Sequence, residues 1–333
     1  MNPAAAAEGL PFAATPRRRI AALVAAVGLR TGVFAATLLG AISLVQGLLA
    51  FAPGDAIDLL PNGDILRAGL EAEWGLDRPV GERILVSIGK VLQGDLGTSL
   101  TYRPGAPVLE LVSRTATHSL GLLAPALLLS VVTALLLALH TAGRPSLSRR
   151  FVQCWSVVPT FLAAYLLVVG INEATWTLIQ GGHISRPEWF ALPDQPSALR
   201  AAIALVVLAW AGGGLTDLHA AFETEVRAVR GAPFIEAARA RGANVRAHLA
   251  LNLLVPTVSL SASRAAGALG AMVVTEKLLL LNGAGATLWQ ACLLRDYPLA
   301  MGITLAFAAI VCGARLMADI LRIAIDPRLR VSA

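Results

Sequence analysis

The chain has 333 residues, of which 56% are hydrophobic and only 14% are charged, and its formal net charge is +6. A mean hydropathy of +0.69 with so little charge is typical of a protein whose solvent is lipid, and it excludes one or two ordinary soluble domains. The positive charge comes almost wholly from arginine, and no basic stripe alternates with aromatic residues. We therefore interpret the arginines as orienting membrane loops and exclude nucleic acid as a partner.

The N-terminal part predicts a first membrane helix that is not cleaved. Residues 1–16 are rich in small residues with little to bury, which predicts a disordered tail. Arg17, Arg18 and Arg19 then give a basic start like that of a signal peptide. However, the apolar run at 31–52 is long enough to cross a hydrocarbon core of ~30 Å at about 1.5 Å per residue. We assign residues 1–30 to an N-terminal cytoplasmic tail and 31–52 to the first transmembrane helix.

The next segment, 53–117, has more acidic than basic residues and predicts a small external cap. Two apolar sets stand at helical spacing, and each is followed by a glycine (Gly75, Gly94): Leu66, Leu70 and Trp74, then Ile84, Ile88 and Leu92. Two short amphipathic helices joined by an Asp-Arg-Pro turn would produce this pattern. The alternative, a solvated loop, would not need the apolar periodicity.

Five further apolar runs predict five more membrane spans, at about 118–140, 151–171, 199–218, 249–281 and 298–321. The expected fold is therefore an all-α polytopic membrane protein with six transmembrane helices and a helical external cap between the first two. Arginines concentrate at 17–19, 144–150, 227–246 and 322–330, which the positive-inside rule assigns to the cytoplasm. Both termini are then cytoplasmic, with a membrane core at 118–321, a cytoplasmic loop at 219–248 and a C-terminal tail at 322–333.

The loop 219–248 is a polar island that contains Glu236 and five arginines. Pro233 suits the first turn of a helix, where its missing N–H costs nothing. Glu236 would lie near the positive end of the helix dipole, Arg239 and Arg241 near the negative end, and Gly242 would end the helix. The alanines at 237, 238 and 240 keep this helix narrow, which permits close docking of a partner protein. The alternative is a helix that only covers the membrane face.

The run "EAARARG" (236–242) followed by "HLALNLLVP" (248–256) resembles the EAA-type cytoplasmic loop in membrane subunits of ATP-binding-cassette importers. The specific likeness is to the B-type permease subunit of the oligopeptide/dipeptide/nickel transport family. Further stretches stand in that family's order: "WGLDRPV" (74–80), "GDLGTSL" (94–100), "RPGAPVLELVSR" (103–114), "VPTF" (158–161), "VVTEKLLLLNGAG" (273–285), "RDYPLAMG" (295–302) and "IDPRLR" (325–330). Together they cover most of the chain from Pro53 onward.

This resemblance implies a permease subunit of the bacterial inner membrane that is not an enzyme and holds no cofactor. Its implied partners are a second homologous permease subunit, two ATP-binding subunits that hold ATP and magnesium, an external solute-binding protein and membrane lipid. Carried over by position, the residues that couple to the ATPase are Glu236, Ala237, Ala238, Arg239, Arg241 and Gly242. The residues implied to lie toward the external binding protein are Trp74, Asp77, Arg78, Gly94 and Asp95.

The chain departs from the family pattern at three places. The stretch between Gly242 and His248, and the loop "HTAGRPSLSRR", each look about one helical turn, ~3.6 residues, short. Arg264 stands in the fifth span where an uncharged amide is expected. A charge at mid-membrane costs roughly 2.5 to 3.5 kcal/mol unless it faces a wet cavity or a partner. Arg264 therefore either lines the substrate path, contacting a carboxylate-bearing solute, or pairs with an acidic group of the second permease.

Other functional classes remain as alternatives. A secondary transporter would show internal repeats with broken helices, and no convincing repeat is present. An intramembrane enzyme would need converging reactive groups, but His118, Glu276 and Asp319 are expected at opposite ends of the membrane. We interpret Glu276 and Lys277 as an interfacial pair with a structural role. The sequence contains no phosphate-binding loop and no metal-ligand spacing, so ATP must bind to another chain.

Overall fold

The computed structural model describes residues 16–51, 57, 67, 69, 71, 78–142, 147–185 and 198–325. Within these ranges the chain is all-α, and its only β feature is an isolated bridge between Thr98 and Pro107. The helices are α1 (Pro16–Phe51), α3 (Val80–Leu92), α4 (Val108–Thr141), α5 (Leu147–Ser156), α6 (Thr160–Gln180), α7 (Ala198–Trp210), α8 (Gly214–Arg230), α9 (Pro233–Ala240), α10 (Val245–Leu278), α11 (Ala284–Leu293) and α12 (Tyr297–Ile325).

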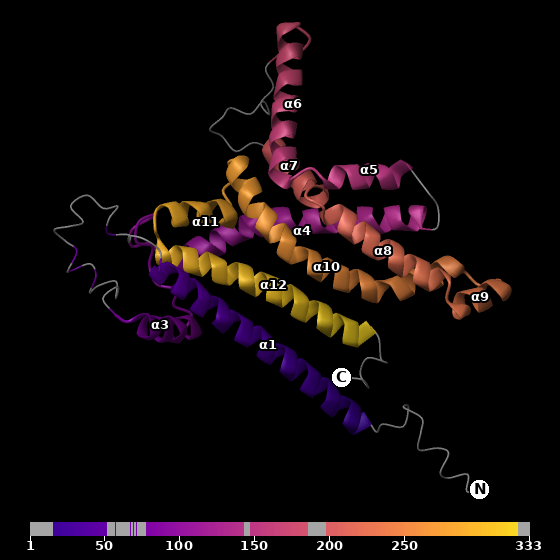
Figure 1. The fold of residues 1–333 in the computed structure, drawn as a ribbon, viewed down its shortest axis with the longest axis horizontal. Helices are drawn as coiled ribbons and strands as arrows, with labels where there is room; N and C mark the ends of the chain where they lie inside the picture. Colours follow the sequence, from indigo (N-terminus) through magenta and orange to yellow (C-terminus); the bar gives the residue numbers. More distant parts are fainter. Residues whose placement is uncertain are drawn as a thin grey trace.

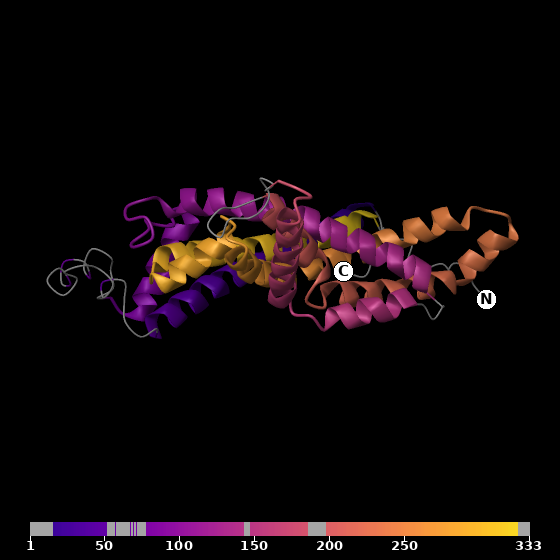
Figure 2. The same ribbon diagram turned by 90° about the horizontal axis from the view of Figure 1, so that it is seen from above.

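The long helices form an elongated bundle with different structures at its two ends. Figure 1 shows α9 at one end, which we call the α9 end, and α3 and α11 toward the other, which we call the α3 end. Figure 2 shows the same arrangement from above. Helices α1 and α12 run antiparallel and share an ion pair between Arg30 and Asp319. The start of α1 and the end of α12 therefore both lie toward the α9 end.

The expected polytopic fold is confirmed. Five helices of the described chain are long and apolar enough to span a membrane, and α7 with α8, bent by 41°, make a sixth if they are one broken span. The second of the two predicted cap helices is present as α3, which ends just before Gly94. Most of the first predicted cap helix lies outside the described residues. The cytoplasmic placement of both termini stays a prediction.

Two helices extend beyond the predicted spans, whose boundaries in the membrane stay predictions. Helix α1 begins at Pro16, so residues 16–30, assigned to the tail, are helical, and the apolar part of α1 runs over Val27–Leu48. The arginines at 17–19 therefore lie within α1, since charged residues do not break a helix. Similarly, α4 begins at Val108, ten residues before the predicted boundary of the second span, because Pro107 occupies the position that precedes its first turn.

Two predicted spans are interrupted by backbone-restricting residues. The span expected at 151–171 is split: α5 ends at Ser156 and α6 begins after Pro159, since a residue that precedes proline avoids the helical conformation. The span expected at 199–218 is broken at Gly212 and Gly213, whose φ angles of +67° and +79° favour glycine. Helix α8 then continues to Arg230, well beyond the predicted end of the span.

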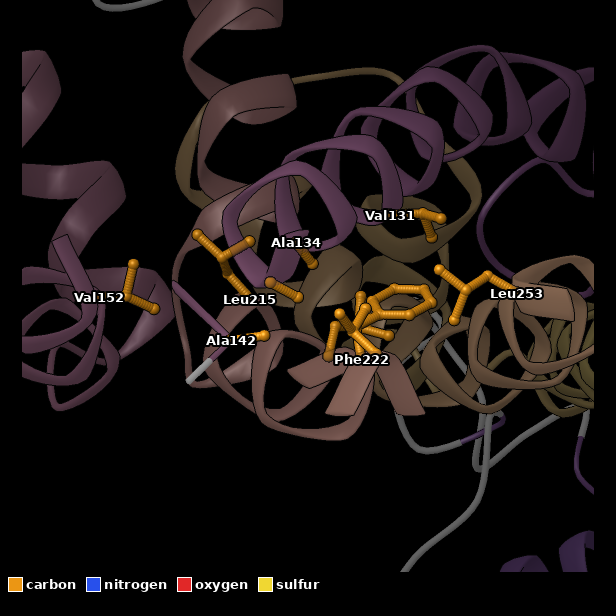
Figure 3. Packing of buried hydrophobic residues seen from close by; sticks show 10 residues of the cluster. Val131, Ala134, Ala142, Val152, Leu215, Phe222 and Leu253 are labelled. Carbon is orange, nitrogen blue, oxygen red and sulfur yellow. The ribbon is translucent and has the colours of Figure 1, made fainter. Parts of the chain in front are cut away.

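The best-packed part of the bundle joins α4, α5, α8 and α10 around one aromatic side chain. Phe222 of α8 is fully buried and belongs to a cluster with Val131, Ala134 and Leu253 (Figure 3). Ala134 and Ala138 are also fully buried, and small side chains let membrane helices approach closely. By contrast, α6 projects from the bundle and leaves Phe161 54% exposed (Figure 1). In a membrane protein such a surface faces lipid or another membrane chain.

The packing around Phe222 predicts a measurable loss of stability. Phe222→Ala should destabilise the detergent-solubilised chain by about 3–5 kcal/mol, because it removes a buried aromatic side chain and leaves a cavity. Phe161→Ala is the matched control and should cost under about 1 kcal/mol, since its ring is exposed in the isolated chain. Thermal unfolding of both variants gives the comparison, and an equal loss for the two would contradict this packing.

Candidate functional site

The helix predicted in the polar island is present as α9. Ala232 is extended, Pro233 occupies the first helical position, Glu236 lies in the first turn and Arg239 in the last. Gly242 follows with a φ of +66°, a conformation that suits glycine and ends the helix. The local sequence signals therefore mark where this short helix begins and ends, as the sequence predicted.

One side of α9 packs on the chain itself and the other faces outward. Ile235 and Ala238 are buried. Five of the six residues expected to couple to an ATPase are exposed: Glu236, Ala237, Arg239, Arg241 and Gly242. Ala238 is buried within the chain itself, and the contact with a partner expected of it stays a prediction. Phe234 adds a 46% exposed aromatic side chain to this helix.

Two of the island's arginines are not in a loop but in α8. Arg230 donates hydrogen bonds to the carbonyl oxygens of Leu139 and Ala142, at 2.8 and 3.2 Å, and so satisfies the last turn of α4. A buried hydrogen bond of 2.8 Å joins Thr141 of α4 to His219 of α8. These contacts tie the base of α9 to α4, so a displacement of α9 would be passed to the bundle by α8.

The break between α7 and α8 frees backbone groups that other elements satisfy. In an unbroken helix the N–H of Gly212 would bond to the carbonyl of Leu208, but here it bonds to the carbonyl of Val158 at 3.3 Å. Arg264 of α10 donates Nη2 to the freed Leu208 oxygen at 3.2 Å. A Cβ atom at Gly214 would overlap the Arg264 guanidinium, so the arginine lies directly against this backbone.

Arg264 lines a cavity of about 360 Å³ between α8 and α10. Asp217 and Ser263 line the same cavity, with Gly214 and Gly267 beside them. The guanidinium is therefore turned toward the chain's own broken helix and a carboxylate of the same chain. Neither expected role, contact with solute or with the second permease, is tested by this arrangement, but the cavity explains how a charge is held within the span.

At the α3 end, a buried carboxylate organises the start of α11. Glu276 is fully buried, and its Oε1 accepts a hydrogen bond of 2.6 Å from Ser119. Its Oε2 accepts the N–H groups of Gly285 and Ala286 at 2.8 and 3.1 Å, which are free donors at the first turn of a helix. Glu276 has the structural role expected of it, but no ion pair with Lys277 occurs in the described part of the chain.

A second buried carboxylate, Asp296, holds the loop before α4. Its Oδ2 accepts the Ser99 hydroxyl at 2.5 Å and three consecutive backbone N–H groups. Those donors belong to Leu100, Thr101 and Tyr102, at 3.0 to 3.1 Å. Neither carboxylate was singled out for this role from the sequence. The signal for Asp296 was available, since an aspartate followed by "YP" at the start of an apolar run is a helix cap.

A larger cavity, of about 770 Å³, opens between α4, the end of α10, α11 and the loop around Tyr102. Its ionisable lining consists of Arg103, Arg114, His118, Glu276 and Lys277, together with the Tyr102 hydroxyl. His118 and Glu276 thus share one cavity, whereas Asp319 pairs with Arg30 on other helices. The sequence does not predict this cavity, because its lining comes from two distant stretches of the chain, 102–118 and 276–290.

The residues expected to meet an external binding protein are only partly described. Trp74 and Asp77 lie outside the described residues. Arg78 is exposed and pairs with Glu82 at 3.4 Å, Gly94 has a φ of +78°, and Asp95 accepts the N–H of Gly97 at 2.8 Å. These three residues lie at the α3 end, outside the lining of the larger cavity. Their contact with a binding protein stays a prediction.

Comparison with known proteins gives a consistent result over most of the chain. Residues 126–331 match the family described as the binding-protein-dependent transport system inner membrane component. A protein of Brucella ovis named as a peptide permease is 30% identical over 310 residues, 89% of this chain and 95% of that protein. An oligopeptide transport system permease of Bacillus subtilis is 27% identical over 305 residues, 88% and 95% of the two chains. An oligopeptide transport system permease of Mycobacterium tuberculosis is 29% identical over 279 residues, 78% and 83% of the two chains.

The hydrogen bonds of the Asp296 carboxylate predict that replacing this one side chain lowers the stability of the chain strongly. Asp296→Ala leaves three N–H groups and one hydroxyl without their acceptor, which should cost at least about 3 kcal/mol and loosen the 95–107 loop. Limited proteolysis and thermal unfolding of the solubilised chain measure both effects. Glu110→Ala is the control, since Glu110 is an exposed acid at the start of α4. Unchanged protease resistance in Asp296→Ala would contradict the role given to this carboxylate.

Proposed function

This chain belongs to the binding-protein-dependent transport system inner membrane components, and from this membership we propose that it is a permease subunit of an ATP-driven importer of peptides or related small solutes. It is a multi-pass protein of the bacterial inner membrane. The peptide assignment is supported by the names of relatives that align along most of this chain.

The observation that carries the proposal is α9, which lies inside the matched region and projects at one end of the bundle (Figure 1). Its exposed residues combine an acid, Glu236, with the bases Arg239 and Arg241 around the aromatic Phe234. An aromatic anchor with charges around it is a common composition for a protein interface. We propose that this surface binds an ATP-binding subunit, which holds ATP and magnesium, on the cytoplasmic side.

The proposed coupling is mechanical. Closure of the ATP-binding subunits moves α9, and α8 passes the movement on because Arg230 and Phe222 hold it against α4. The two glycines of the α7–α8 break can absorb changes in backbone angle and act as the hinge. The two orientations of the pore are then populations that nucleotide binding shifts. The chain contributes no chemical step of its own to this cycle.

The remaining proposed partners follow from the same membership. A second homologous permease subunit would complete the pore and cover part of the exposed apolar surface on α6. An external solute-binding protein would deliver solute at the α3 end, where α3 and Arg78 lie. Two ATP-binding subunits, one for each permease, complete the assembly, and lipid covers the rest of the apolar surface.

The proposed coupling surface predicts a selective loss of partners. The tagged chain, purified in mild detergent from its native membrane, should recover a second permease and ATP-binding subunits by mass spectrometry. Glu236→Arg together with Arg241→Glu should reduce recovery of the ATP-binding subunits at least about tenfold, because the charges at the interface are reversed. Recovery of the second permease should not change.

Glu110→Arg, which also reverses an exposed charge but at the α3 end, is the control and should recover all partners. If the unmodified chain is recovered alone or as a homo-oligomer, it does not engage an ATPase, and the importer mechanism is wrong. A secondary transporter would then be the remaining functional hypothesis for this membrane protein.

For Arg264 we propose a bracing role at the α7–α8 break. Gly214→Ala should reproduce the effect of Arg264→Gln, because the added methyl group takes the place of the guanidinium. Both variants should lower the amount of solute moved per ATP hydrolysed by about tenfold, with the order of preference among solutes unchanged. Uptake and phosphate release in the same vesicles measure this ratio.

Gly270→Ala on the same helix is the control, since a Cβ there meets nothing within 4 Å. If Arg264 contacts solute instead, Arg264→Gln should change which solutes are preferred while Gly214→Ala does not. If it pairs with the second permease, Arg264→Gln should weaken the complex with selectivity intact. Either result would contradict the bracing role.

A further inference from the structure

The cavity at the α3 end has the size and shape of a small-molecule site. Its volume of about 770 Å³ falls within the ~300–1,000 Å³ usual for ligand pockets. Three parts of the bundle form its walls: the first turns of α4, the end of α10 and the first turns of α11. Figure 1 shows these elements meeting toward the same end of the molecule, opposite α9. The cavity is concave, which suits a small solute better than a flat protein surface.

The charge of the lining is strongly unbalanced. Three side chains carry permanent positive charge at neutral pH, Arg103, Arg114 and Lys277, and His118 lies with them. Among the described residues of the lining, Glu276 is the only acid. None of the three permanent cations takes part in a salt bridge within the part of the chain that the structure describes.

Within the described chain the single carboxylate makes no ion pair with these cations, and its oxygen atoms accept hydrogen bonds from other groups. Oε1 accepts the Ser119 hydroxyl, and Oε2 accepts two N–H groups from the start of α11. Glu276 is fully buried, whereas Arg103 and Arg114 are exposed. The lining therefore keeps a surplus of positive groups that have no acidic partner in the described chain, whereas the one negative group is buried and hydrogen-bonded.

The rest of the lining favours an organic anion with neutral parts. Asn282 and Gln290 offer amide donors and acceptors, and Leu111, Leu280 and Leu281 form apolar wall. A solute with one carboxylate, peptide groups and small apolar side chains matches this combination. An inorganic anion would use the cations but not the amides or the leucines.

We propose that this cavity receives the transported solute on the α3 side and binds its C-terminal carboxylate through Arg103, Arg114 and Lys277. The inference rests on the proposed function, since it identifies where a peptide is held and by which end. Arg264 is then not the residue that binds the solute carboxylate. It lies in the middle of α10, and its guanidinium is hydrogen-bonded at the α7–α8 break.

The chain offers an unusually direct test, because it contains only two lysines, Lys277 in the cavity and Lys90 on the exposed surface of α3. Native membranes that contain the full complex are treated with an amine-acetylating reagent, and the acetylation of both lysines is quantified by mass spectrometry. Trialanine is the probe, and trialanine amide, which lacks the carboxylate, is the matched control. If the dissociation constant is about 1 mM, about 10 mM trialanine should slow acetylation of Lys277 about tenfold.

The expected result is protection of Lys277 by trialanine, little protection by the amide, and no effect of either on Lys90. Arg114→Gln, which keeps Lys277, should reduce the protection at least threefold. Equal protection by trialanine and its amide, or none by either, would overturn the proposal. Equal protection by inorganic phosphate would mean a general anion site and would overturn the assignment to the solute carboxylate.

Uptake of ¹³C-labelled trialanine by cells with and without the chain separates this inference from the proposed function. Chain-dependent uptake without protection of Lys277 leaves the importer in place and overturns the cavity assignment. Protection without chain-dependent uptake supports the site and overturns peptide import as the function. Uptake and protection together, both reduced in Arg114→Gln, support the two proposals jointly.

Discussion

Within a membrane no water is available to satisfy backbone N–H and C=O groups, and this constraint organises the whole molecule. At several places where a helix ends or breaks, a polar side chain from elsewhere in the chain binds the freed backbone groups. Arg264 bonds to the carbonyl freed at the α7–α8 break, and Arg230 bonds to the last turn of α4. Glu276 and Asp296 accept the free N–H groups at the α3 end. The ionisable residues that appear most anomalous in the sequence are therefore the ones that make irregular backbone possible.

This distribution gives the bundle two well-braced ends and one adjustable region between them. At the α9 end, Phe222 and Arg230 hold α8 firmly against α4. At the α3 end, the two buried carboxylates hold α11 and the loop before α4 as one unit. Between them, Gly212 and Gly213 allow the chain to turn, with only one arginine against the break. A transporter that transmits a conformational change from one side of the membrane to the other needs rigid segments connected by a hinge.

The sequence predicted those elements whose signals are local. Pro233, Glu236 and Gly242 are local signals for the bounds of α9, and apolar runs indicate the membrane spans by their length. Motif order along the chain was enough to indicate the family, which the match over residues 126–331 then established. The boundaries were less predictable. Helix α6 begins only after Pro159, and α1 begins before the charged run at 17–19. Hydropathy indicates which residues can span a membrane, but not where the helix that contains them begins.

By itself, then, the sequence determined that the chain is a helical membrane protein of this family with a short polar helix between two of its long ones. Only the tertiary structure decided what the charged residues do. Arg114 is far in the chain from the neighbours Glu276 and Lys277, and nothing in this spacing indicates that the three line one cavity or that the carboxylate already accepts hydrogen bonds. Hydrophobic periodicity reports on single helices, whereas partners for polar groups come from whichever helix packs alongside, so they are settled by packing alone.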